Sequence, residues 1–171
     1  MPFLENTKII RPGTKEDLDT MIDLEKIFFG DKKAEIKEAY EFILEHGRVS
    51  IEYSQTPTGM LATIPVDKIL QNKKSVLALP KESPFRIRIE GGYLDNYSGH
   101  EFVCAFVSKR YSPNLTDIFK SMKKAVGFVY EDAGEALEFY KRLGCKILKK
   151  KVDNVHEPGK KDYVLVYGRS V

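Results

Sequence analysis

The sequence predicts a mixed α/β (α+β) fold that forms one domain over residues 1–171. Segments with helical periodicity alternate with short segments of the two-residue periodicity typical of strands. Hydrophobic residues make up 42% of the 171 residues, which is ordinary for a globular protein and enough for a buried core. No repeat, low-complexity tract or linker-like segment divides the chain.

The first part of the chain predicts a strand, two helices and two more strands. Thr14 is the expected N-cap of the first helix, with Asp17 three residues later, and Gly47 is a natural residue to follow the second helix. Apolar residues at helical spacing predict both helices, and alternation predicts the strands. In order, the expected elements are a strand at 8–11, helices at 15–29 and 33–46, and strands at 48–53 and 60–66.

The middle of the chain is harder to assign. Residues 67–72 fit a short helical turn, and residues 75–79 fit either a strand or an extended loop. Residues 85–90 alternate apolar and charged side chains, which predicts a strand. Residues 101–108 are the most apolar run and predict a central strand. We expect Val103, Ala105 and Val107 on one face of it, and Phe102, Cys104 and Phe106 on the other.

The last part predicts helix, strand, helix and two strands. Asn114 is the expected N-cap of a helix that covers residues 115–126, and residues 126–130 follow as a strand. Asp132 with Glu135 forms a capping-box pattern for a last helix that stops at Gly144. The final elements are strands at 145–155 and 163–166, joined by a hairpin loop at 156–162.

Composition excludes several classes of protein. The net charge of +3 is too small to argue for a nucleic-acid partner, and no segment is long and apolar enough to span a bilayer. The first residues lack the features of a signal peptide, so we expect a cytoplasmic protein. Cys104 and Cys145 then read as reduced core thiols, with a disulfide as the alternative. His46, His100 and His156 lack metal-ligand spacing, so we expect no metal site.

Charge is distributed unevenly along the chain. Residues 1–107 hold 14 Lys and Arg against 17 Asp and Glu, whereas residues 108–171 hold 14 against 8. A basic second half favours an anionic ligand such as a nucleotide phosphate. A solvated basic face explains the same counts.

Two local patterns resemble the GCN5-related N-acetyltransferases, known as GNAT proteins. Ile9-Ile10-Arg11-Pro12 followed by Thr14-Lys15-Glu16-Asp17-Leu18 is similar to the opening strand and helix of that family. Ala136, Phe139-Tyr140 and Leu143-Gly144-Cys145 resemble its late helix. The resemblance covers essentially the whole chain. It implies an acyl-CoA N-acyltransferase fold, with a mixed central sheet of six to seven strands and about four flanking helices.

The resemblance also implies a binding site for acetyl-CoA in a V-shaped gap between two central strands. In that family, a turn after the strand directs its backbone N–H groups at the pyrophosphate. The pattern of this turn is Arg or Gln, two residues, Gly, one residue, and then Gly or Ala. Here Arg110 matches, but Pro113 and Leu115 replace the small residues, and Ala133 replaces a frequent asparagine. The implied cofactor-binding residues are Phe106, Val107, Ser108, Lys109, Arg110, Ser112, Asn114 and Thr116.

Two residues are the catalytic candidates. By the resemblance, Tyr140 protonates the departing CoA thiolate, although its helical spacing also suits a core aromatic residue. Glu101 is the candidate general base, with Glu90 and His100 as alternatives. Cys104 is a poor nucleophile because apolar neighbours raise the pKa of a thiol.

These observations lead to one functional hypothesis and one alternative. The chain is expected to move an acetyl group from acetyl-CoA to a primary amine of a small molecule or protein. The alternative is a non-catalytic GNAT-fold binding or regulatory module that has lost efficient CoA binding. Partners are then acyl-CoA and an amine, with a possible homodimer and neither membrane nor specific nucleic acid. An acidic run (Glu35, Glu38, Glu41 and Glu45) either favours a cationic amine or is a solvated face.

Overall fold

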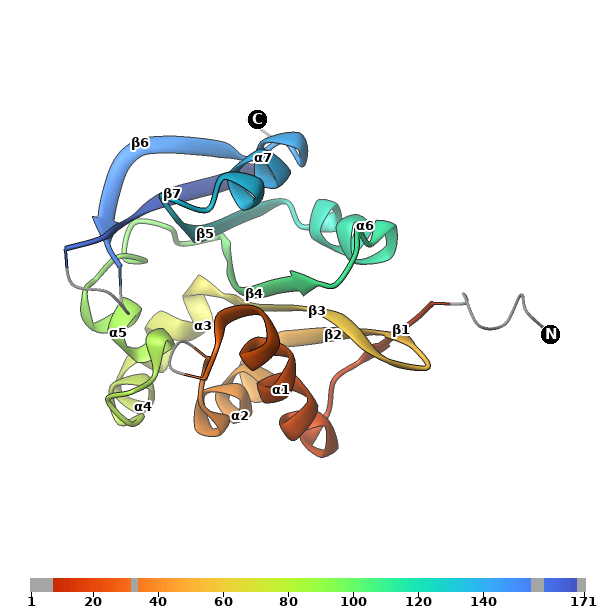
Figure 1. The fold of residues 1–171 in the computed structure, drawn as a ribbon. Helices are drawn as coiled ribbons and strands as arrows, with labels where there is room; N and C mark the ends of the chain where they lie inside the picture. The colour runs from red at the N-terminus through yellow and green to blue at the C-terminus, as the bar shows by residue number, and fades with distance from the viewer. Residues whose placement is uncertain (1–7, 32–33, 155–158, 169–171) are drawn as a thin grey trace.

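The strands of the protein form one seven-stranded sheet (Figure 1). The computed structural model describes residues 8–31, 34–154 and 159–168. The strand order is β1-β2-β3-β4-β5-β7-β6, at the upper end of the expected number. β4 and β5 are parallel, and the other neighbouring pairs are antiparallel. The strands are β1 (Ile9–Pro12), β2 (Arg48–Ser54), β3 (Thr56–Pro65), β4 (Glu101–Ser108), β5 (Lys124–Tyr130), β6 (Lys146–Asp153) and β7 (Lys161–Gly168).

The described residues hold seven α-helices, more than the four or so expected. The additional helices are short and lie between β3 and β4, where the sequence left part of the structure open and predicted a strand at residues 85–90. The helices are α1 (Leu18–Phe29), α2 (Lys37–His46), α3 (Val66–Gln71), α4 (Lys73–Leu77), α5 (Pro84–Glu90), α6 (Pro113–Ser121) and α7 (Gly134–Arg142). A 3₁₀ turn over Lys15–Asp17 leads into α1.

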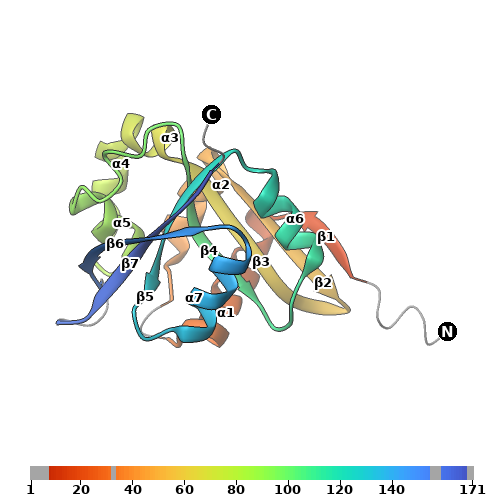
Figure 2. The same cartoon turned by 90° about the horizontal axis from the view of Figure 1, so that it is seen from above.

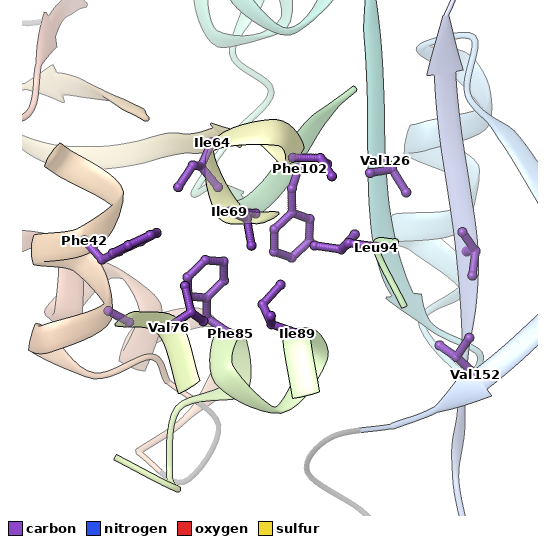
Figure 3. Close-up of a cluster of buried hydrophobic side chains, with 13 residues drawn as sticks. Phe42, Ile64, Ile69, Val76, Phe85, Ile89, Leu94, Phe102, Val126 and Val152 are labelled. Atoms are coloured by element: carbon purple, nitrogen blue, oxygen red, sulfur yellow. The ribbon is translucent and has the colours of Figure 1, made fainter. Parts of the chain in front are cut away.

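The helices cover both faces of the sheet (Figure 1). α1 and α2 pack on β2, β3 and β4 through one apolar cluster, which includes Met21, Ile43 and Ile51. α6 and α7 pack on the opposite face through a second cluster, which includes Phe119 and Leu165. A third cluster lies beneath α3, α4 and α5 (Figure 3). This arrangement leaves β4 buried from both sides, as the apolar sequence of that strand predicts.

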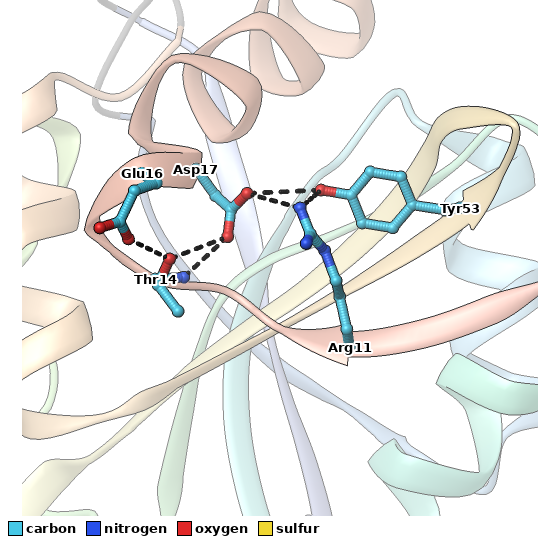
Figure 4. Close-up of polar contacts among 5 residues, drawn as sticks. All are labelled: Arg11, Thr14, Glu16, Asp17 and Tyr53. Carbon is cyan, nitrogen blue, oxygen red and sulfur yellow. Dashed lines mark hydrogen bonds and ion pairs between the residues drawn. The ribbon is translucent and has the colours of Figure 1, made fainter.

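A polar network fixes the start of α1 (Figure 4). The carboxylate of Asp17 accepts hydrogen bonds from the backbone N–H of Thr14 at 2.9 Å and from Arg11 at 2.9 Å. Arg11 also donates to the hydroxyl of Tyr53 on β2 at 2.9 Å. The predicted partnership of Thr14 and Asp17 is therefore confirmed, and it ties the first helix to the first two strands.

The strand predicted at residues 85–90 is wrong, because these residues form α5. Ser83 caps this helix by accepting a hydrogen bond from the backbone N–H of Arg86, and Pro84 occupies its first turn, where proline is well tolerated. Phe85 and Ile89, four residues apart, both point into the core (Figure 3). A run of six residues is too short for alternation to separate the two periodicities.

Several element boundaries also differ from the prediction. α2 begins at Lys37 instead of residue 33, and α6 ends at Ser121, so that β5 begins at Lys124. The N-cap of α7 is Ala133, not the predicted Asp132. Part of the predicted loop at 156–162 lies outside the described residues. None of these differences changes the order of the predicted elements around β4.

Candidate active site

β4 and β5 run parallel but are paired at two positions in the described structure. Glu101 lies opposite Ala125, and Phe102 lies opposite Val126. Figure 2 shows the two strands diverging from this end, with α7 near the open side. Backbone N–H and C=O groups that leave a ladder need other partners. The parted strands therefore make a V-shaped opening whose β4 edge is available to a ligand.

A β-bulge at Cys104 accounts for the divergence. On β3, Ala62 lies opposite Ala105 and Thr63 lies opposite Val103, so Cys104 is the extra residue of β4. A bulge bends its strand and increases the local twist. β4 consequently turns away from β5 directly after the paired positions.

The bulge also changes which side chains share a face. Val103 and Phe106 pack with α6 and α7, whereas Ala105 and Val107 pack with α1 and α2. The prediction that Val103, Ala105 and Val107 share one face is therefore wrong. Strict alternation fails wherever an extra residue enters a strand.

A cavity of about 840 Å³ occupies the open end of the V. Its walls come from the end of α1, the end of β4, the turn before α6, the loop before α7 and one face of α7. Pockets for small molecules and cofactors commonly measure about 300–1,000 Å³. Five of the residues expected to bind the cofactor line this cavity: Phe106, Val107, Ser108, Arg110 and Ser112.

The mouth of the cavity combines aromatic and charged side chains. Phe29 and Tyr111 line it and are 43% and 66% exposed, which is unusual for large apolar rings. Arg110 and Arg142 also line it, and both arginines are exposed. These residues suit a ligand that has flat rings and negative charge.

The helix α6 begins two residues earlier than it would with Asn114 as its N-cap. Ser112 is the N-cap: its hydroxyl accepts from the backbone N–H of Leu115 at 3.0 Å, and Pro113 occupies the first turn. The prediction of Asn114 as the cap is wrong, because Pro113 already has helical geometry. The carbonyl of Ser112 accepts from the N–H of Thr116 at 3.0 Å. Among the otherwise unpaired N–H donors of this helix N-terminus, that of Leu115 is thus satisfied by the Ser112 side chain, and Pro113 has none.

A buried carboxylate lies directly behind this turn. Glu52 on β2 is fully buried and accepts a hydrogen bond from the hydroxyl of Ser112. Thr58 also donates to Glu52 at 3.1 Å, and the ammonium of Lys8 is 3.8 Å away. An anion behind a helix N-terminus opposes the positive end of the helix dipole. The turn is therefore less attractive to a pyrophosphate than an uncompensated N-terminus.

The other three expected cofactor residues do not line the cavity. Lys109 and Asn114 are exposed, and the backbone N–H of Lys109 donates to the carbonyl of Thr58 at 2.9 Å. Thr116 is 2% exposed, and its hydroxyl has no hydrogen-bond partner among the described residues. Contact between these residues and a cofactor remains a prediction.

Tyr140 lies in an aromatic cluster next to the cavity. Its ring centroid is 6.4 Å from that of Phe106, 6.4 Å from that of Phe119 and 5.5 Å from that of Phe139. Phe139, not Tyr140, lines the cavity. Burial raises the pKa of the Tyr140 phenol, so the group stays protonated at neutral pH. Its role as a proton donor remains a prediction.

Glu101 lies at the closed end of the V, where β4 and β5 are paired. It lines neither the large cavity nor the smaller one described next. Burial raises the pKa of its carboxyl, and the positive charge of Arg48 opposes this shift. A raised pKa suits a general base, but the candidate stands at the far end of the strand from the cavity.

A second, smaller cavity of about 130 Å³ shares Phe29 with the first and contains two acidic residues, of which the sequence analysis named Glu35 but not Glu25. Glu25 on α1 and Glu35 before α2 both line it. Burial raises the pKa of the Glu25 carboxyl from 4.5 to about 8, and burial also raises that of Glu35. Glu25 lies four residues after Met21, on the buried face of α1, and this spacing was the available signal.

Cys104 also lines the smaller cavity. Burial raises the pKa of its thiol well above the ordinary value, and the nearby carboxylates of Glu35 and Glu25 raise it further. Cys104 and Cys145 are both free thiols. The environment of Cys104 agrees with the expectation that it is a poor nucleophile.

Two further features of the described residues bear on the site. They contain no group of three or more His, Cys, Asp or Glu side chains that is arranged to hold a metal ion. They also contain no helix of the length and hydrophobicity needed to cross a bilayer.

Comparison of the sequence with protein-family models and with curated proteins finds no match. Comparison of the fold with solved structures finds clear matches. Ard1 from Thermoplasma volcanium aligns with a TM-score of 0.64 at 12% identity, covering 94% of this chain and 96% of that one. Naa50 from Arabidopsis thaliana, in complex with a bisubstrate analogue, aligns with a TM-score of 0.61 at 12% identity, covering 95% and 99%.

A third match is an acetyltransferase of the GNAT family from Bacillus cereus. It aligns with a TM-score of 0.60 at 10% identity, and the alignment covers 97% of this chain and 100% of that one. Identities this low show a shared fold and do not transfer an activity. Together with the parted central strands, these matches show that the chain has the fold of the GCN5-related N-acetyltransferases.

Proposed function

We propose that this chain is a cytoplasmic N-acetyltransferase that moves an acetyl group from acetyl-CoA to a primary amine. The observation that carries the proposal is the opening between β4 and β5, which ends in a cavity of about 840 Å³. A gap of this kind suits an extended thioester-bearing arm, because the free β4 edge supplies hydrogen-bonding groups along its length.

The diphosphate of the cofactor would lie at the turn between β4 and α6. Arg110 lines the cavity there and can form charge-assisted hydrogen bonds with phosphate oxygens. Pro113 has no N–H, and Ser112 already satisfies the N–H of Leu115. The loss of one charge-assisted bond costs about 1.5–3 kcal/mol, or roughly one to two decades of affinity. The turn thus favours weakened rather than abolished binding.

The reaction would be a direct attack of the amine on the thioester carbonyl carbon. The new C–N bond forms, the C–S bond breaks, and the sulfur leaves as CoA thiolate. Tyr140, which burial keeps protonated, would supply a proton to this thiolate. Glu101 is the base predicted from the sequence and would take a proton from the amine, if the acceptor reaches the closed end of the V.

A non-catalytic binding module is the alternative, and one observation favours it. The N-terminus of α6 is occupied by Ser112, with the buried carboxylate of Glu52 behind it. Such a turn attracts phosphate less strongly than a glycine-rich one. On this alternative the same gap holds a ligand without catalysis.

Thermal unfolding with and without acetyl-CoA separates the two possibilities. A ligand at 100 times its Kd stabilises the folded state by about 2.7 kcal/mol, which raises the Tm of a chain this size by about 5–11 °C. We expect such a shift with acetyl-CoA and a smaller one in an Arg110→Ala variant. No shift at millimolar acetyl-CoA would favour the non-catalytic module.

A thiol-release assay with a panel of amines then tests the chemistry. We expect acetyl-CoA turnover that depends on the amine and that falls at least tenfold in Tyr140→Phe. Equal rates in the two proteins would remove Tyr140 from the mechanism while leaving the transfer itself in place.

A further inference from the structure

The smaller cavity lies between α1, the segment before α2, α5 and β4. Phenylalanines form most of its apolar wall, among them Phe29 and Phe85. Its polar side is formed by the carboxylates of Glu25 and Glu35. An engineered cavity of about 150 Å³ holds benzene, so a cavity of about 130 Å³ has room for about five or six heavy atoms.

The two carboxylates have no basic partner among the described residues. Glu25 is 4% exposed and accepts a hydrogen bond from the backbone N–H of Glu35. Glu35 accepts from the backbone N–H of Ile36 at 3.0 Å and of Phe85 at 2.9 Å. Buried charges are normally paired with an opposite charge, because desolvation is costly. Glu25, whose pKa burial raises to about 8, avoids this cost by keeping a proton, and a cationic ligand between the two carboxyl groups would take the place of that proton.

Among the described residues of the cavity wall, the one basic side chain is already neutralised. Arg88 pairs with the buried carboxylate of Asp162 on β7 and donates to the carbonyl of Asp153 at 3.2 Å. Its guanidinium also stacks over the ring of Phe128 at 4.2 Å. Arg88 consequently holds α5 against β7 and leaves Glu25 and Glu35 uncompensated.

A long connection between β3 and β4 walls off this side of the sheet. Antiparallel neighbours need only about two to five residues to join them, but this chain uses residues 66–100 and folds them into α3, α4 and α5. α5 is held in place by Phe85, which packs between Phe42 and Phe102 (Figure 3). An anchored wall over the cavity suits a small acceptor better than a polypeptide.

The smaller cavity adjoins the expected site of the thioester. Phe29 lines both cavities. On β4, Cys104 lines the smaller cavity and Phe106 the larger, and two strand residues span about 7 Å. Phe102, one of the paired positions of β4, also lines the smaller cavity, so a ligand there lies along β4 between the paired end and the larger cavity.

We infer that the smaller cavity is the acceptor site and that it takes a small primary amine, whose nitrogen lies between the carboxylates of Glu25 and Glu35. The inference rests on the proposed function, since it assigns the second substrate of that reaction. It also places Glu25, instead of Glu101, next to the reacting nitrogen.

The transfer step follows from this placement. An ammonium group between the two carboxylates favours their ionised forms. Glu25 takes one proton from the nitrogen, whose lone pair then attacks the carbonyl carbon of the thioester. The C–N bond forms and the C–S bond breaks. Tyr140 gives its proton to the departing sulfur and regains one from the nitrogen of the tetrahedral adduct.

Binding of n-butylamine without acetyl-CoA tests the site independently of catalysis. Calorimetric titration of the full chain should show binding that weakens at least tenfold in Glu25→Gln and in Glu35→Gln. Glu41→Gln, on the exposed face of α2, is the matched control and should bind as the wild type does. Thermal unfolding of each variant verifies that it folds. Absence of binding in the wild type, or unchanged binding in both cavity variants, would overturn the inference.

Acetyl transfer then separates this inference from the proposed function. With acetyl-CoA, n-butylamine should be acetylated at least tenfold faster than a peptide with a free N-terminus, and Glu25→Gln should lower kcat more than Glu101→Gln does. Turnover that prefers the peptide, or that ignores Glu25, would refute the acceptor site and leave the acetyltransferase proposal standing. Amine binding that depends on Glu25 without any turnover would refute the proposed reaction and leave the site.

Discussion

Replacing Glu25 by glutamine should make the protein more stable at alkaline pH. Burial raises the pKa of the Glu25 carboxyl from 4.5 to about 8, against the hydrogen bond from the N–H of Glu35. Between these two values the folded chain binds a proton that the unfolded chain releases. The unfolding free energy therefore falls as the pH rises from 4.5 to about 8. The stabilisation from the proton on Glu25 is present in full only below pH 4.5.

The size of the effect follows from the shift. One pKa unit corresponds to 1.36 kcal/mol, so a shift from 4.5 to about 8 makes the wild type lose about 4–5 kcal/mol between pH 4.5 and pH 9. Glu35, Tyr40, Cys104 and Arg88 face the same region. The charge of Glu35 raises the pKa of the Glu25 carboxyl further, whereas the hydrogen bond from Tyr40 lowers it. A glutamine keeps the shape of the side chain and does not titrate.

Urea denaturation at pH 5 and at pH 9 measures the difference directly. Between pH 5 and pH 9, we expect the unfolding free energy of the wild type to fall by about 4–5 kcal/mol more than that of Glu25→Gln. Glu41→Gln, which changes an exposed glutamate, controls for the loss of one charge. The reasoning is refuted if the Glu25→Gln and wild-type curves stay parallel across this range.

Three further substitutions test other parts of the structure. Ser112→Ala removes the cap of α6 and the hydrogen-bond donor to the buried carboxylate of Glu52, and should lower the unfolding free energy in urea by about 2–4 kcal/mol. Asn114→Ala, at the exposed neighbouring position, should change it by less than about 0.5 kcal/mol. Arg88→Met leaves the buried carboxylate of Asp162 without an opposite charge and should lower the unfolding free energy in the same assay by about 3–5 kcal/mol. Adding Asp162→Asn should recover part of this loss, and effects that simply add would contradict the ion pair. Ala133→Asn adds an amide to the wall of the larger cavity. Calorimetry should show acetyl-CoA binding several-fold more tightly, because one hydrogen bond contributes about 0.5–1.5 kcal/mol. Weaker binding would contradict the place of Ala133 beside the cofactor.

The order of the elements around β4 could be predicted from the sequence because each has a strong local signal. The run at residues 101–108 is apolar at nearly every position, as a strand buried on both faces requires. Gly144, with φ of +95°, ends the last helix in a conformation that favours glycine. These features are determined by residues close together in the chain, so one sequence is enough to predict them.

The helix α5 and the bulge at Cys104 could not be predicted in the same way. The alternation of residues 85–90 is compatible with a strand, and packing of Phe85 against Phe102, seventeen positions away, favours the helix. The bulge depends on the register between β3 and β4. Both are decided by tertiary contacts, which overrule local preference.

The residues of the candidate site also differ in whether a local signal or a tertiary contact places them. The turn at Arg110 and Ser112 was predicted because it follows a recognisable strand, and it does line the cavity. Glu35 was predicted in an acidic run that either favours a cationic amine or is a solvated face. It lies before the first turn of α2 and accepts a hydrogen bond from the backbone N–H of Phe85. Its partner Glu25 comes from another helix, and the sequence alone does not bring the two together.

The central claim is that the gap between β4 and β5 holds acyl-CoA, and a crystal structure of the protein grown with CoA tests it most directly. The account predicts density for the pantetheine arm along β4 from Cys104 to Ser108, with the pyrophosphate beside Arg110. An empty gap at millimolar CoA, or CoA bound elsewhere on the surface, would contradict it.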